Sequence, residues 1–141
     1  YSNLTNSEMN FLLAKFLDDT SSRSKLFYSL YNKIVEFCEK EGENNLVCKE
    51  KLLLKYIDTA ILESIMESCP FCNGTGIIVF KHKLDKCNHC HQGKFIFTDA
   101  VRADLIGLKK GKFEKNKGIY KKITEELINI EYSALSKIGD T

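Results

Sequence analysis

Apolar residues recur at three- and four-residue intervals along most of this chain, and this spacing predicts amphipathic helices. The first helix is short and has Ser7 as its N-cap. Gly42 ends the second helix, as a C-terminal stop does, and a polar turn precedes the third. The apolar positions of the three are Phe11, Leu12 and Phe16; then Phe27, Leu30, Tyr31, Ile34 and Phe37; and then Leu46, Leu53, Leu54, Ile57, Ile61 and Ile65. We expect the second and third helices to form an antiparallel hairpin.

Two more helices are predicted in the last third of the chain. Thr98 is a favourable N-cap, and Asp99 in the first turn faces the positive end of the helix dipole. A glycine- and lysine-rich connection follows from Lys109 to Lys115, and the last helix opens near Asn116. The apolar positions of these two helices are Ala100, Val101, Ala103, Leu105 and Leu108, and then Ile119, Ile123, Leu127, Ile130, Ala134 and Ile138.

Two short runs of β-branched and aromatic residues, Ile77 to Phe80 and Lys94 to Phe97, predict the strands of a small β-hairpin insert. The expected fold is therefore mainly α. A chain of 141 residues with 43% hydrophobic content can form one compact unit or two small ones. We expect one unit, with an N-terminal helical region 1–68, a hairpin region 69–97 and a C-terminal helical region 98–141. No stretch is long and apolar enough to span a membrane.

Two Cys-x-x-Cys pairs, separated by fourteen residues, dominate the hairpin region. Zn²⁺ takes four thiolate ligands in a tetrahedron, and two such pairs brought face to face by a hairpin supply them. Gly74 and Gly76 follow the first pair, where the backbone must turn sharply and aim N–H groups at sulfur. The pattern predicts one structural zinc ion with the ligands Cys69, Cys72, Cys87 and Cys90.

Other interpretations of the cysteines stay open. Two disulfides are disfavoured because the chain shows no apolar secretory segment, and a redox Cys-x-x-Cys comes singly within a βαβ pattern that is absent here. His82, His89 and His91 lie near enough in sequence to replace a cysteine, but with four thiolates at hand we expect them at the surface. Cys38 and Cys48 are interpreted as unpaired core residues, which favours a reducing cytosol.

The formal net charge of +2 hides a local concentration of lysine. Residues 1–68 sum to −3, residues 69–97 to +3 and residues 98–141 to +2. Between Lys109 and Lys122 stand seven lysines and one acid, Glu114, for a net charge of +6. Such a run attracts polyanions, although the same composition is common on an ordinary solvated surface.

A short helix, a glycine-containing connection and a helix that begins in lysines follow one another as in a helix-turn-helix. The connection is longer than usual, so an ordinary helical hairpin packed on the zinc hairpin is the alternative. Candidates for groove contact are Arg102, Asn116, Lys117, Tyr120 and Lys121, and candidates for phosphate contact are Lys109, Lys110, Lys112, Lys115 and Lys122. Arg102 has a structural alternative, an ion pair with Asp99 or Asp104, and Asn116 has another as a helix cap.

The arrangement resembles the antitermination protein Q family of lambda-type bacteriophages. The resemblance rests on Cys-x-x-Cys-x-Gly-Thr-Gly from Cys69 to Gly76, on the second cysteine pair, and on the Ala-x-Arg-Ala segment from Ala100 to Ala103. By element order it covers about residues 25–138, while residues 1–20 match nothing in the family. The family's second Cys-x-Gly-x-Gly is altered here, because Gln92 stands next to Gly93 where a glycine is usual.

The Cys-x-x-Cys-x-Gly-x-Gly unit also resembles the zinc region of DnaJ-type co-chaperones, which carry four copies where this chain has two. The resemblance to the Q family implies a DNA-binding antitermination factor that acts on sigma-containing RNA polymerase in the cytoplasm of a bacterial host. The apolar face of the acidic N-terminal hairpin is the expected surface for polymerase or for self-association, and the oligomeric state is left open. We interpret the chain as a non-enzyme, because four thiolates leave zinc no open position.

Two alternatives belong to other functional classes. A co-chaperone-like module would bind exposed hydrophobic peptides through the zinc hairpin. An RNA-binding zinc ribbon would stack bases on Phe95 and Phe97 and contact phosphate with Lys94.

Overall fold

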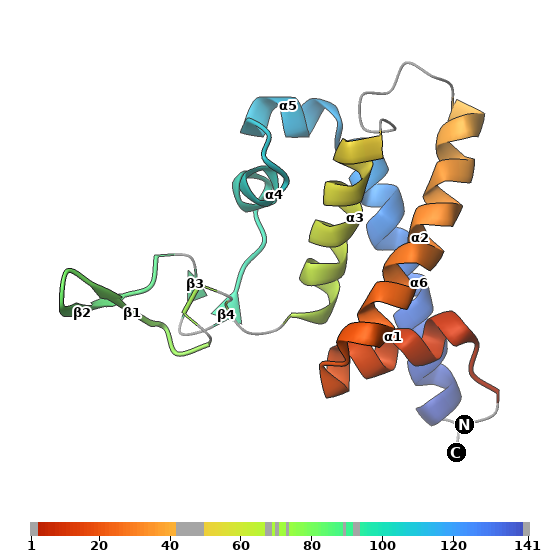
Figure 1. Cartoon of the computed structure of the whole chain (residues 1–141), viewed down its shortest axis with the longest axis horizontal. Coiled ribbons are helices and arrows are strands. Elements are labelled where there is room, and N and C mark those ends of the chain that lie inside the picture. Colours follow the sequence, from red (N-terminus) through yellow and green to blue (C-terminus); the bar gives the residue numbers. More distant parts are fainter. Residues whose placement is uncertain are drawn as a thin grey trace.

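Helices dominate the computed structural model of this chain, which describes residues 3–41, 50–66, 69, 71–72, 74–88, 90–91 and 94–139 (Figure 1). A small antiparallel hairpin and a cluster of four cysteines complete the fold, so the predicted class is confirmed. The elements are α1 (Asn6–Leu17), α2 (Thr20–Glu41), α3 (Glu50–Ile65), β1 (Ile77–Phe80), β2 (Lys83–Lys86), β3 (Cys90–His91), β4 (Lys94–Phe95), α4 (Asp99–Ile106), α5 (Lys110–Lys115) and α6 (Lys117–Gly139).

The main hydrophobic core lies between α1, α2, α3 and α6. Helices α2 and α3 run antiparallel side by side, as predicted, with α6 behind them and α1 across their lower end (Figure 1). The predicted stripes supply most of this core, because the apolar face of each helix must be removed from water. Phe16 is an exception, since its side chain is 60% exposed and lies outside the core. Its largest fully buried side chains include Phe11, Leu30, Ile34, Leu53, Ile57, Ile61, Ile123 and Leu127. Gly42 and Leu46 lie outside the described residues.

Helix α1 begins one residue before the predicted N-cap. Thr5, not Ser7, is the N-cap: its side chain accepts from the Glu8 N–H, and the Glu8 carboxylate accepts from the Thr5 N–H. This reciprocal capping box satisfies two backbone donors at once, which a cap at Ser7 would not do. Ser7 lies within the first turn, and its hydroxyl is 3.1 Å from that of Ser29 in α2.

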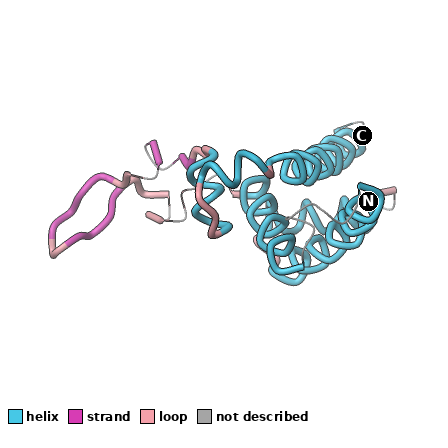
Figure 2. The backbone as a smooth tube through the Cα atoms, turned by 90° about the horizontal axis from the view of Figure 1, so that it is seen from above, coloured by secondary structure: helices cyan, strands magenta, loops and turns pink. Residues whose placement is uncertain are grey.

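The cysteine region forms two separate two-stranded sheets (Figure 2). Strands β1 and β2 pair antiparallel, with Ile77 opposite Lys86 and Val79 opposite Leu84, and their hairpin projects away from the helices (Figure 2). Strand β2 was not predicted, because it has one apolar residue, Leu84, among three charged ones and so shows no apolar pattern. The predicted run from Lys94 to Phe97 is a strand only at β4, which pairs with β3.

The predicted connection from Lys109 to Lys115 is wrong in its secondary structure, because residues Lys110–Lys115 form helix α5. Phe113 explains the difference: it is fully buried, and its ring lies 5.8 Å from that of Tyr56 and 5.5 Å from that of Tyr120. The predicted cap of α4 is confirmed, since the Thr98 hydroxyl accepts from the Val101 N–H. The predicted helix pair, α4 and α6, is therefore joined by a third short helix.

Cys38 is buried near the end of α2 and is disulfide-bonded, so the expectation that it is unpaired is wrong. Cys48 lies outside the described residues. With Cys38 oxidised, the argument from unpaired cysteines for a reducing compartment is lost. Within the described ranges, no helix combines the length and the apolar character needed to cross a membrane.

Candidate functional site

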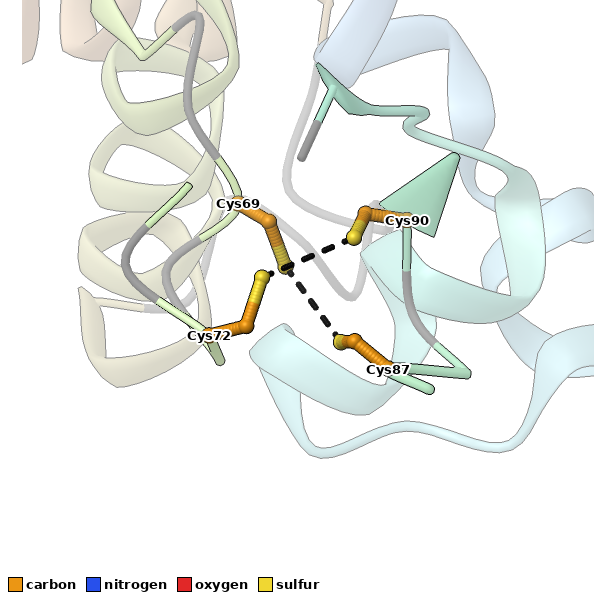
Figure 3. A group of neighbouring side chains, drawn as sticks. All are labelled: Cys69, Cys72, Cys87 and Cys90. Carbon is orange, nitrogen blue, oxygen red and sulfur yellow. Dashed lines mark hydrogen bonds between the residues drawn. The ribbon is translucent and has the colours of Figure 1, made fainter. Parts of the chain in front are cut away.

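The four predicted zinc ligands come together at one point beyond the end of α3. Cys69 and Cys72 precede β1, Cys87 follows β2 and Cys90 begins β3, so the β1–β2 hairpin folds the second pair back onto the first (Figure 3). The sulfur atoms all lie within 4.8 Å of one another. Three of the cysteines are buried, and together they form a small core of their own, separate from that of the helices.

The distances between sulfur atoms fit a metal centre. Cys69 Sγ lies 3.9 Å from Cys87 Sγ, and Cys72 Sγ lies 3.6 Å from Cys90 Sγ (Figure 3). Four sulfurs bound at about 2.3 Å to a central Zn²⁺ stand about 3.8 Å apart in a regular tetrahedron. The observed distances lie on either side of that value. The four thiols can therefore hold one metal ion.

The two glycines that follow the first cysteine pair allow the backbone to turn around the sulfur atoms. Gly74 and Gly76 have φ angles of 80° and 78°, a region in which a β-carbon would be strained. In this conformation the Gly76 N–H donates to Cys72 Sγ at 3.2 Å, and the Gly74 N–H donates to the Cys69 carbonyl. Burial opposes ionisation of Cys72, but the Gly76 N–H and the neighbouring thiols lower its pKa to about 6. Burial raises the pKa of the Cys69 thiol.

The geometry distinguishes between the alternative interpretations of these cysteines. None of the four forms a disulfide bond. His82 is exposed in the turn between β1 and β2 with a φ of 64°, and among the described side chains the group suited to a metal contains cysteines alone. His89, Gln92 and Gly93 lie outside the described residues, so the altered second turn is not described.

A second feature of the site is a surface of exposed lysines around α5, which we call the α5 basic surface. Its members are Lys109, Lys110, Lys112 and Lys115, with Lys121 on the first turns of α6. Lys110 lies 3.9 Å from Glu114. Among the described residues, the other four form no ion pair. Lys122 is half-buried, pairs with Glu126 at 3.3 Å and lies over the Phe37 ring.

Three candidates for groove contact instead belong to a network that joins α3, α4 and α6. The Arg102 guanidinium donates to the Glu63 carboxylate at 2.6 and 3.2 Å and to Asp99 at 2.9 Å. The buried Tyr120 hydroxyl donates to Glu63 at 3.2 Å, and Lys117 pairs with Asp99 at 3.0 Å. This arrangement favours the structural alternative for Arg102, with Asp99 as predicted and Glu63 in addition.

Opposite charges in this network stabilise the ionised forms of Arg102 and Asp99. Although partial burial disfavours its charge, the hydrogen bonds to Glu63 hold the pKa of Arg102 above its ordinary value. Burial, with the Glu63 carboxylate beside it, raises the pKa of Tyr120. The Lys117 ammonium lowers the pKa of Asp99. Glu63 was not predicted as a partner, because it stands 39 residues from Arg102 and no local spacing indicates the contact.

Asn116 lies at the junction of α5 and α6. Its side-chain amide donates to the Lys112 carbonyl at 2.8 Å, so it caps the end of α5 and not the start of α6. Its own carbonyl accepts from the Tyr56 hydroxyl at 3.4 Å. Contacts of these residues with DNA stay predictions. For the RNA-binding alternative, the side chains of Lys94 and Phe95 are not described, and Phe97 is half-buried.

Comparisons with known proteins add no family to this description. No family model, no curated protein and no solved structure matches the chain. The function is therefore inferred from the residues themselves.

Proposed function

We propose that this chain is a zinc-containing, DNA-binding transcription antitermination factor of the kind that the resemblance to the phage Q family implies. It would bind duplex DNA near a late promoter and act on sigma-containing RNA polymerase in the cytoplasm of a bacterial host. The proposal rests chiefly on the α5 basic surface, since four of its five lysines have no acidic partner among the described residues. Lysines left without partners attract phosphate through charge.

Helix α5 holds the lysines of this surface in a fixed arrangement, which supports a role in binding. Phe113 anchors α5 in the core between Tyr56 and Tyr120, and the lysines on either side of Phe113 point to solvent. A rigid helix presents charges in a constant arrangement, which costs less entropy on binding than a mobile loop. We assign phosphate contact to Lys109, Lys110, Lys112, Lys115 and Lys121.

The metal has a structural role in this proposal, and we assign it as zinc. A tetrahedral set of four thiolates suits zinc or iron, and it leaves no coordination position for a water or a substrate. The chain is accordingly proposed to act by binding and not by catalysis. Elemental analysis of protein purified without chelator tests the assignment. One zinc per chain is expected, whereas iron or no metal would contradict it.

The first prediction is that duplex binding depends strongly on salt. If about four or five lysines each neutralise a phosphate, the logarithm of affinity should fall with the logarithm of salt concentration with a slope of roughly −4 to −5. Fluorescence anisotropy with a labelled duplex at several salt concentrations measures this slope. Lys112→Glu and Lys115→Glu, singly and together, should weaken binding to specific and random duplexes alike.

A matched control is Lys25→Glu, which changes the same charge on an exposed position of α2. It should leave the affinity close to that of the unchanged chain, and all these variants should keep its thermal midpoint. Equal losses for the Lys25 and Lys112 variants would mean that net charge, and not the α5 basic surface, carries the binding. In vitro transcription across a terminator then tests the antitermination role itself.

A protein-binding role for the β1–β2 hairpin is the second candidate, and one observation favours it. Ile77, Val79 and Leu84 are 51%, 73% and 76% exposed, and the strand register places them on one face. A binding panel of duplex DNA, single-stranded RNA and an unfolded polypeptide separates the candidates. Binding to the polypeptide alone, with little dependence on salt, would replace the DNA-binding proposal with a co-chaperone-like one.

A further inference from the structure

The turn at the end of the β1–β2 hairpin is built from residues that such a turn does not favour. Lys81 and His82 form a two-residue loop, because Phe80 pairs with Lys83 in the strand register. The φ angles of the two loop residues are 50° and 64°, so both lie in the left-handed region. A two-residue loop with this backbone is a type I′ turn, in which Asn-Gly is preferred and bulkier side chains are unfavourable. Unfavourable backbone conformations of this kind are concentrated at functional sites.

An exposed aromatic ring and exposed cations surround this turn. The Phe80 side chain is 60% exposed, and the Lys81 ammonium lies 5.4 Å from the centre of its ring. Lys83 is exposed opposite Phe80. Within the part of the chain that the structure describes, neither lysine forms an ion pair. We call Phe80, Lys81, His82 and Lys83 the hairpin tip.

The charge of the hairpin favours an anionic partner. Residues 77–86 contain three lysines and one acid, Asp85, which gives a formal net charge of +2 with His82 neutral. Asp85 lies on the same strand face as Lys83, and its carboxylate accepts from the backbone N–H of Lys86 at 2.8 Å. The excess of positive charge is complementary to phosphate groups.

The hairpin also has dimensions that fit a groove of DNA. It projects away from the described helices, so none of them covers its tip (Figure 2). At its base, Ile78 packs on the cysteine cluster and the Cys87 N–H donates to the Gly76 carbonyl at 2.9 Å, which fixes the hairpin to that cluster. A strand of four residues extends about 10 Å. The major groove is about 8.5 Å deep and about 12 Å wide, and it admits a two-stranded β-ribbon.

We propose that the hairpin tip enters the major groove of duplex DNA, as a second contact in addition to the α5 basic surface. Lys81 and Lys83 bind phosphates at the edge of the groove. The Phe80 ring contacts the base edges, where the C5 methyl group of thymine is its apolar partner. In Figure 1 the hairpin and α5 lie on the same side of α3, so one duplex can reach both. The inference rests on the proposed binding of duplex DNA and adds a part of the chain that contacts bases.

Replacing the tip by the preferred turn separates binding from folding. Lys81→Asn combined with His82→Gly keeps the hairpin and removes one charge, so the thermal midpoint and the metal content should not fall. The affinity for a labelled duplex at about 0.1 M salt should fall about fivefold to tenfold, and the salt slope should become shallower by about 1. Fluorescence anisotropy measures both. Lys25→Gln removes one charge from an exposed position of α2, and this control should change neither value.

The Phe80 contact has a test of its own. Replacing thymidine by deoxyuridine removes the C5 methyl groups of the duplex and should weaken binding of the unchanged chain about fourfold, the effect of one buried methyl group. Phe80→Ala should bind more weakly than the unchanged chain and should respond little to this replacement. Phe16→Ala is the matched control, because Phe16 is also 60% exposed and also has a lysine, Lys15, over its ring. It should respond to deoxyuridine as the unchanged chain does.

Different results contradict the hairpin contact and the proposed function. Full affinity in the Lys81 and His82 double variant, together with lost affinity in Lys112→Glu, would overturn the hairpin contact alone. An unchanged chain that binds no duplex would overturn both. Tighter binding to a single strand than to the duplex, or equal losses in the two controls, would overturn the place of the tip in the groove. A Phe80→Ala variant that still distinguishes thymidine from deoxyuridine would do so as well.

Discussion

Arg102 can be interpreted from the sequence either as a DNA-binding residue or as a residue that holds helices together. Its guanidinium is bound to two carboxylates from different helices, and 21% of the side chain is exposed. Removing it leaves Glu63 partly buried without its cation, which is more costly than losing a solvent-exposed pair. The arginine therefore holds α4 against α3.

The prediction at this scale is that Arg102→Ala lowers the free energy of unfolding by about 2 kcal/mol. Arg23→Ala is the control, since Arg23 lies 4.0 Å from an exposed Asp58 and its loss should cost within about 0.5 kcal/mol. Urea denaturation measures both values. An unchanged stability for Arg102→Ala, together with lost preference for a specific duplex over a scrambled one, would restore Arg102 as a base-reading residue.

At the scale of elements, Glu8 attaches α1 to the C-terminal half of α6. Its carboxylate accepts from Lys137 at 2.7 Å, from the Ser133 hydroxyl and from the Thr5 N–H. The Lys137 ammonium is the largest influence, and these donors lower the pKa of Glu8 from 4.5 to about 2. Because the folded pKa lies below the ordinary one, the stabilisation is complete above pH 4.5 and is lost as pH falls toward 2.

We therefore expect Glu8→Gln to flatten the fall in thermal midpoint that the unchanged chain shows between pH 4.5 and 2. Circular dichroism melts at a series of pH values measure this difference. Glu114→Gln is the control, because the Glu114 side chain is 49% exposed and its carboxylate has a single, more distant partner, the Lys110 ammonium at 3.9 Å. A variant at Glu8 with the same pH profile as the unchanged chain would show that the contact adds no pH-dependent stability.

At the scale of the whole molecule, the cysteine cluster and the helical core are separate hydrophobic clusters. Among the residues that the structure describes, the helical core contains Phe11, Ile57, Leu127 and fifteen further buried residues, while the cysteine cluster contains three buried cysteines with Ile78 and Cys90 against them. So few apolar side chains are not expected to hold a segment of this length folded, and binding of a metal ion by the four thiols would supply the missing free energy.

Removing the metal should therefore unfold residues 69–97 and leave the helices intact. Treatment with a strong chelator, or Cys87→Ser, is expected to keep most of the far-ultraviolet circular dichroism of the helices. Limited proteolysis should then cut within the cysteine region first. Loss of the whole helical signal on chelation would mean that the two clusters fold as one unit.

The sequence by itself determined the parts of this protein that depend on neighbours along the chain. The spacing of the cysteine pairs identified Cys69, Cys72, Cys87 and Cys90, because a metal-binding turn is built from residues two to four positions apart. The periodic stripes identified α2, α3, α4 and α6, and Thr98 was identified as a cap, for the same local reason.

Only the tertiary structure decided the rest, because it depends on contacts between distant residues. Helix α5 forms where Phe113 meets Tyr56, 57 positions earlier in the chain. Arg102 is turned inward by Glu63, and Glu8 meets Lys137 across the molecule. Such pairs leave no periodic signal in a single sequence, since their free energy is gained when packing removes both partners from water. The fold thereby separates the lysines that face solvent from the charged residues that hold the helices together.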